Sequence, residues 1–173
     1  MNAIQTIEVK GKTINIFNDD VADPRKEYDH LGKMVCWHRR YTMGDSHTWD
    51  SPEDFNADIK SNKNIILPLF MYDHGSISLS TSSFSCPWDS GQLGYIFVSK
   101  EVIRKEYKWQ RLTKKRIKQI ENNLKEEIKE YTYFINGEVY GLEILDEKEE
   151  LVDSCYGFYG IDNCINYAKE IID

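Results

Sequence analysis

The sequence has 173 residues, of which 40% are hydrophobic and 22 are aromatic, a composition that excludes an intrinsically disordered chain. The net charge of −7 disfavours nonspecific contact with nucleic acid over most of the surface. No apolar run is long enough to cross a membrane, and the first residues lack a secretory signal pattern. We therefore expect one cytoplasmic domain, spanning residues 1–173, that makes no contact with a membrane.

The beginning of the chain predicts strands joined by polar loops. Residues 6–17 alternate in polarity around Lys10 and Gly11, and this pattern predicts a hairpin. Residues 19–32 are polar and predict a loop or a short helical turn. Residues 33–43 alternate again and predict a strand.

A short helix and three more strands are expected next. Ser51 precedes Pro52 and caps the start of the helix. The three strands are predicted over residues 64–73, 76–84 and 93–98. A turn at Asp73-His74-Gly75 separates the first two of these strands.

The segment CPWDSGQLGY, residues 86–95, is interpreted as a structured turn that leads into the last of these strands. Trp88 is expected to pack against the fold. Asp89, Ser90 and Gln92 are expected to tie down the loop through hydrogen bonds to its backbone. The same turn is expected to border a functional surface, although its spacing does not specify a reaction.

The hydrophobic period then changes from that of a strand to that of a helix. Helices are predicted over about residues 99–109 and 113–131. Asn136–Gly137 predicts a hairpin turn between two strands, and an acidic turn at 146–150 predicts a second hairpin. These elements predict an α+β fold: an antiparallel sheet built from hairpins, two central helices and a short C-terminal helix.

Reactive side chains gather in the polar segments, where function often lies. A small hydrolase-like enzyme would use a cleft formed by four of them: His38, His74, Cys86 and Asp89. Cys86 would be the nucleophile, although no local signature of a cysteine protease surrounds it. A metal site would draw on His38, His47, His74 and Cys86, although their spacing matches no metal motif. The alternative is that these side chains have structural roles, and no cofactor is expected.

Arg39 and Arg40 are adjacent in the predicted strand over residues 33–43, so they would point to opposite faces. Either arginine can bind a phosphate or carboxylate through two parallel hydrogen bonds. The alternative is that their charge protects an edge strand from pairing with another chain.

Residues 100–118 contain nine basic and two acidic residues, so this stretch carries +7 and the rest of the chain −14. Together with Tyr107 and Trp109, the stretch predicts a surface that follows a nucleic-acid backbone. The alternative is an ordinary solvated helix face. The candidate basic patch consists of Lys100, Arg104, Lys105, Lys108, Arg111, Lys114 and Lys115.

Three segments resemble uncharacterised accessory proteins of bacteriophages and integrated mobile elements: LGKMVCWHRRYTMGDSH (31–47), CPWDSGQLGYIFVS (86–99) and DSCYGFYG (153–160). The resemblance implies a setting more than a mechanism, because no activity is established for the set. It implies a small protein of the bacterial host cytoplasm. Many such proteins block host defences by binding a host protein.

The leading hypothesis is therefore a non-enzymatic protein that binds a host protein, such as a component of a defence system, and acts as an anti-CRISPR or anti-restriction inhibitor. In one version of this hypothesis its acidic residues mimic the phosphates of DNA, although the basic stretch 100–118 departs from a pure DNA mimic. The enzyme and the nucleic-acid-binding protein remain the alternatives. The candidate binding residues are Asp19, Asp20, Asp23, Glu27, Asp29, Arg39, Arg40, Trp88, Asp89 and Gln92.

Overall fold

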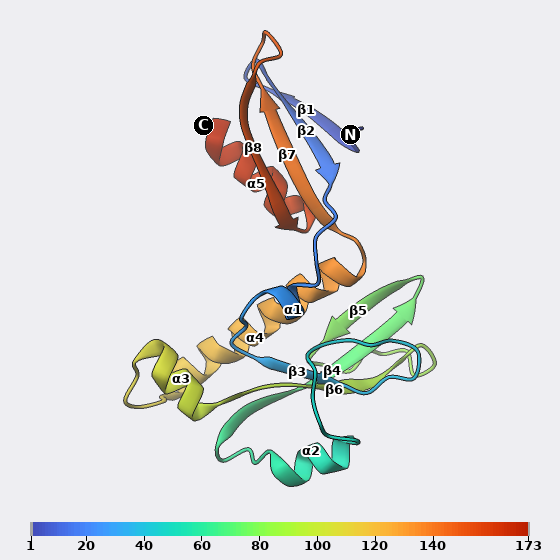
Figure 1. The fold of residues 1–173 in the computed structure, drawn as a ribbon, viewed down its shortest axis with the longest axis vertical. Coiled ribbons are helices and arrows are strands. Elements are labelled where there is room, and N and C mark those ends of the chain that lie inside the picture. The colour runs from blue at the N-terminus through green and yellow to red at the C-terminus, as the bar shows by residue number, and fades with distance from the viewer. Residues whose placement is uncertain (1, 173) are drawn as a thin grey trace. The chain divides into compact units, whose positions relative to one another are not determined.

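The computed structural model describes residues 2–172, which divide into two compact units (Figure 1). The first unit joins the two ends of the chain, up to Pro24 and from Tyr133 onward, and the second unit comprises Arg25–Thr132. Two four-stranded antiparallel sheets, a long helix and a C-terminal helix make this an α+β fold, which confirms the predicted class. Within residues 2–172, no helix is long and apolar enough to span a bilayer. Folding of the whole chain as one domain stays a prediction.

The sheet of the first unit has the strand order β1-β2-β7-β8, and all neighbours are antiparallel. Its strands are β1 (Gln5–Val9), β2 (Lys12–Asn18), β7 (Val139–Leu145) and β8 (Leu151–Tyr159). Helix α5 (Ile161–Ile172) buries its apolar stripe against one face of the sheet (Figure 1). Both hairpins predicted within these strands are present, since β1 pairs with β2 and β7 pairs with β8.

The sheet of the second unit has the strand order β3-β6-β4-β5. Its strands are β3 (Lys33–Cys36), β4 (Asn64–His74), β5 (Ser76–Ser80) and β6 (Ser90–Ser99). Four helices follow or interrupt these strands: α1 (Pro24–Glu27), α2 (Pro52–Asp58), α3 (Lys100–Tyr107) and α4 (Lys114–Ile135). Ser51 caps α2 as predicted, because its side chain accepts a hydrogen bond from the Asp54 N–H.

Helices α4 and α2 lie on opposite faces of this sheet (Figure 1). On the α4 face, a Cβ atom built on Gly32 would lie 2.4 Å from the Leu124 side chain and 2.9 Å from the Ile96 side chain, so any larger residue at this position would displace these two core side chains. On the α2 face, the ring of Phe55 lies 5.2 Å from that of Phe97 and contributes no exposed surface. The sheet therefore has a core on each side and is a rigid support for the loops at its edges.

The predicted strand over residues 33–43 was wrong beyond Cys36. The Arg40 N–H donates to Nδ1 of His38, which turns the chain. The Asp45 N–H then donates to the Met34 carbonyl, so the chain returns along β3. Arg39 and Arg40 therefore lie in a loop, and the edge-strand interpretation of their charge does not hold.

The hairpin predicted at Asn136–Gly137 was also wrong. Helix α4 continues to Ile135, and Gly137 has a φ of 69° directly after it. The Gly137 N–H donates to the Phe134 carbonyl and the Glu138 N–H to the Tyr133 carbonyl. The same pair of residues that suits a hairpin thus ends a helix here, because a left-handed glycine serves both purposes.

Candidate functional site

Two loops of the second unit bring several of the predicted site residues to one surface. The loops are residues 37–47, after β3, and residues 81–89, before β6. We call this region the Trp88 surface and define it as His38, Arg39, Arg40, Trp88 and Gln92.

Trp88 has 91% of its area accessible to solvent, the largest fraction among the exposed large hydrophobic residues of the described chain. The expectation that it packs against the fold was therefore wrong. The turn beneath it is nevertheless fixed. The Ser90 hydroxyl donates to the Cys86 carbonyl, and the Asp73 N–H donates to the Asp89 carbonyl over 2.8 Å. The indole thus projects from a backbone held by the sheet, which lowers the entropy lost when a partner covers it.

A hollow of about 310 Å³ lies beside Trp88. Met71 and Leu93 contribute apolar surface to it, and both are buried. His38 lines this hollow and also a larger, open one of about 640 Å³, which is lined mainly by residues of the 37–47 loop. The two hollows are therefore neighbours, and a ligand or peptide lying across them would contact both loops.

Arg40 is held in place but remains accessible. Its Nη2 atom lies 2.7 Å from the Asp73 carboxylate, which also accepts a hydrogen bond from the Tyr41 hydroxyl. The Arg40 side chain is 69% exposed, and its guanidinium lies 5.3 Å from the centre of the Tyr41 ring. The His38 ring stacks on the same tyrosine at 5.0 Å. Arg39 is exposed next to this group.

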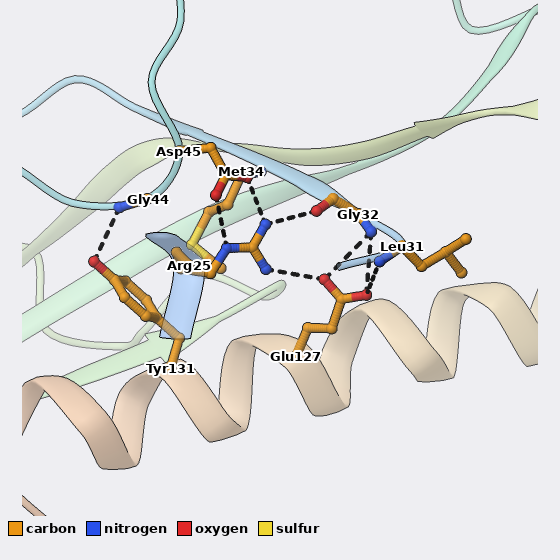
Figure 2. Close-up of polar contacts among 8 residues, drawn as sticks. All are labelled: Arg25, Leu31, Gly32, Met34, Gly44, Asp45, Glu127 and Tyr131. Atoms are coloured by element: carbon orange, nitrogen blue, oxygen red, sulfur yellow. Dashed lines mark hydrogen bonds and ion pairs between the residues drawn. The ribbon is translucent and has the colours of Figure 1, made fainter. Parts of the chain in front are cut away.

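A buried ion-pair network anchors the other end of the 37–47 loop (Figure 2). Arg25 donates to both carboxylate oxygens of Asp45 and lies 3.0 Å from the Glu127 carboxylate. Glu127 accepts the backbone N–H of Gly32, and the Gly32 carbonyl accepts from Arg25. Asp45 also accepts the Met34 N–H over 2.7 Å. The network therefore joins α1, β3, the loop and α4.

Sequence reasoning missed this network. Arg25 and Glu127 are separated by 102 residues, and no local pattern connects residues at such a distance. A second contact between residues far apart in the sequence is a hydrogen bond, which the Gly44 N–H donates to the Tyr131 hydroxyl over 3.0 Å (Figure 2). The only sequence signal was that Glu127 lies one position before the apolar stripe residue Ile128 of the predicted helix.

His47 lies at the inner side of the larger hollow, between two tryptophans. Its ring centre is 4.9 Å from that of Trp37 and 6.0 Å from that of Trp49. Because a carbonyl only accepts, the Nε2 atom donates its hydrogen to the Cys36 carbonyl over 3.1 Å. Its Nδ1 atom is buried and has no hydrogen-bond partner among the described residues. His47 is thus part of the aromatic core under the loop.

The enzyme hypothesis required Cys86, a histidine and Asp89 to act in series. The Cys86 thiol donates to the Asp89 carboxylate over 3.6 Å, and Nδ1 of His74 lies 3.3 Å from the same oxygen. Both groups therefore contact the carboxylate, whereas a cysteine nucleophile needs its thiol against the imidazole. His38 contacts Tyr41 instead.

The metal hypothesis required at least three ligands in one place. Among residues 2–172, no three His, Cys, Asp or Glu side chains are grouped so that they could hold a metal ion. His47 contacts the Cys36 carbonyl and His74 contacts Asp89. His38, His47, His74 and Cys86 thus do not come together in one such group.

The candidate acidic residues divide between the two units. Asp19 accepts the Gly157 N–H over 2.8 Å, so it has a structural role in the first unit. Asp20 is exposed there and Asp23 is half-buried, while Glu27 and Asp29 are exposed in the second unit. Gln92, the remaining candidate, donates to the Gly94 carbonyl over 3.3 Å beside the smaller hollow.

Comparison with known proteins adds no relative to this picture. A scan of family models, a search of curated proteins and a search of solved structures each found no match to this chain. The interpretation of the Trp88 surface therefore depends on its own geometry.

Proposed function

We propose that this chain is a binding protein that captures a host protein through the Trp88 surface. The observation that carries the proposal is the 91% exposure of Trp88 on a turn that is fixed by hydrogen bonds. Tryptophan and arginine dominate the energetic centres of protein interfaces. Here an exposed tryptophan lies beside a shallow hollow that Arg40 also lines.

The composition of the surface supports a protein partner. The surface places apolar area next to an accessible guanidinium. Trp88, Met71 and Leu93 supply the apolar area, and Arg40 supplies the guanidinium. Such a mixture of an aromatic anchor and a polar rim is typical of interface centres. When a partner covers Trp88, the apolar area of the indole is removed from water, and this burial contributes to affinity.

The proposed role is that of an accessory protein of a phage or mobile element, which inhibits a host defence protein such as a CRISPR or restriction component. This role is supported by the resemblance of residues 31–47 and 86–99. Those two segments contain the residues of the Trp88 surface. The exposed carboxylates Asp20, Glu27 and Asp29 remain candidates for a second contact with such a partner.

The test is a pull-down from bacterial lysate with the tagged full-length chain, followed by mass spectrometry and measurement of affinity for the retained protein. Trp88→Ala is expected to cost about 2 kcal/mol or more, a roughly 30-fold loss of affinity. Arg40→Ala is expected to weaken binding less. Leu151→Ala is the matched control, because Leu151 is 60% exposed in the first unit and is expected to leave affinity unchanged.

Two results would contradict the proposal. One is a retained partner whose affinity is equal for the wild-type chain and the Trp88→Ala variant. The other is an equal loss with Leu151→Ala, which would indicate general adhesion of exposed apolar side chains. In the first case, a partner that is also lost on changing Asp20, Glu27 and Asp29 to lysine would place binding on the carboxylates instead.

A further inference from the structure

The second unit carries a cationic surface that the proposed binding function does not use. It is formed by α3, the following loop and the first turns of α4. The exposed cations that define it are Arg104, Lys105, Lys108, Arg111, Lys114, Lys115 and Lys118. We call it the basic helical surface. The remainder of the chain outside residues 100–118 carries −14, so this surface is a local exception to the overall charge.

The start of α4 is electrostatically unfavourable without an external anion. The first turn contains no acidic residue, whereas three consecutive cations begin at Lys114. The N-terminal end of a helix carries partial positive charge, so cations there destabilise it. Lys114 and Lys118 also lie one turn apart on the same face, where like charges repel. A bound polyanion would relieve both effects.

The surface is preorganised by contacts that hold its three parts together. The Asn123 side chain of α4 donates to the Tyr107 hydroxyl of α3 over 2.7 Å. Arg116 donates to the Arg111 carbonyl of the loop over 2.8 Å, and its guanidinium lies 4.7 Å from the centre of the Trp109 ring. The exposed cations therefore project from two helices and a connecting loop, which these contacts hold in a fixed arrangement.

The two aromatic rings of this region, those of Tyr107 and Trp109, already stack on groups within the protein. The rings of Tyr107 and Trp109 stack at 4.5 Å, and Arg116 covers Trp109. Proteins that bind single strands stack unpaired bases on free aromatic faces. Because the two rings stack on each other and Arg116 covers Trp109, the surface is better suited to a phosphate backbone than to unstacked bases.

We propose that the basic helical surface binds the phosphate backbone of a nucleic-acid duplex without reading its sequence. Residues four apart on a helix lie about 6 Å from one another, and a duplex offers one negative charge for about every 1.7 Å of its axis. Cations on successive helical turns can therefore contact phosphates along the groove edge without regard to the base sequence. The negative remainder of the chain confines contact to this surface and makes it strongly dependent on salt.

The test uses the full-length chain and a fluorescent DNA duplex of about 20 base pairs, with anisotropy measured between about 25 and 200 mM KCl. The logarithm of the association constant is expected to fall linearly with the logarithm of salt concentration. The double variant Lys114→Gln with Lys118→Gln is expected to make this slope shallower by about 1.8, because two phosphate contacts are lost. The control pair is Lys148→Gln with Lys169→Gln, two exposed lysines of the first unit that change the net charge equally.

An unchanged slope in the control and a shallower slope in the first double variant would support the proposal. Absence of binding at the lowest salt would overturn it, and so would an equal effect of both double variants. A single strand of the same length that binds more tightly than the duplex would also overturn it, since that result requires free stacking faces. Duplex RNA is measured alongside, and comparable affinity is expected for a site that contacts only the backbone.

Discussion

Only 1% of the Arg25 side chain is exposed to solvent. Burial alone lowers the pKa of a guanidinium, but hydrogen bonds to Asp45 and Glu127 and the charges of those carboxylates more than offset this, so the pKa of Arg25 is raised. Its charge is therefore permanent, and both carboxylates depend on it. A buried ion pair contributes little against an apolar replacement of all partners, but losing one partner is costly.

Replacing Arg25 by methionine is expected to lower the free energy of unfolding by about 3 kcal/mol, because two partly buried carboxylates lose their counter-charge. Arg39→Met is the matched control, since Arg39 is exposed, and it is expected to change stability by less than about 0.5 kcal/mol. Urea unfolding monitored by circular dichroism measures both variants. Equal stability of the two variants would show that the network in Figure 2 does not support the fold.

The Cys36 thiol provides a second expectation at the scale of one residue. Burial, with a smaller effect of the Asp45 charge, raises its pKa to about 12. Since the thiolate is the reactive form, a thiol with this pKa is almost entirely protonated at pH 8. Iodoacetamide is therefore expected to alkylate Cys36 at least 100-fold more slowly in the folded chain than in urea, as followed by peptide mass spectrometry. Equal rates in the two states would contradict the raised pKa of this thiol.

At the scale of elements, the sequence predicts a helix or strand well where one periodic pattern decides it. The stripe through Ile120, Leu124 and Ile128 predicts α4, and all three residues are buried. Prediction fails where the local preference opposes the tertiary contacts. Residues 131–135 are rich in strand formers, yet they extend α4, because propensity is a weak term beside packing. The segment 38–41 leaves β3 because long-range bonds return the loop along that strand.

Gly94 determines how closely β3 and β6 can approach. A Cβ atom at this position would lie 1.9 Å from the Val35 carbonyl oxygen, so any side chain forces the two backbones apart. Gly94→Ala is expected to destabilise the chain by about 2 kcal/mol. Gly91 lies in the same strand and has no atom within 4 Å of such a Cβ, so Gly91→Ala is the matched control and is expected to be nearly neutral. Urea midpoints of the two variants that do not differ would contradict this packing.

The candidate site is a property of the tertiary structure, because no single residue or element forms it. The Trp88 surface combines segments on either side of α2, β4 and β5, and the segments meet only because β3 and β4 both pair with β6. The sequence could identify Trp88, Arg39 and Arg40 as unusual residues. It could not predict that Trp88 is exposed, since exposure depends on contacts that the turn makes with β4. The second unit is itself inserted between β2 and β7 of the first.

This insertion makes the two units unequal in their ability to fold alone. The second unit contains all four strands of its sheet within Arg25–Thr132, together with helices that cover both faces. The first unit draws two strands from each end of the chain, and two paired strands alone are marginal in water. The fragment 25–132 is therefore expected to unfold cooperatively in urea, whereas the fragment 133–173 is expected to lack a cooperative transition. A fragment 25–132 without such a transition would instead support folding of residues 1–173 as one cooperative domain.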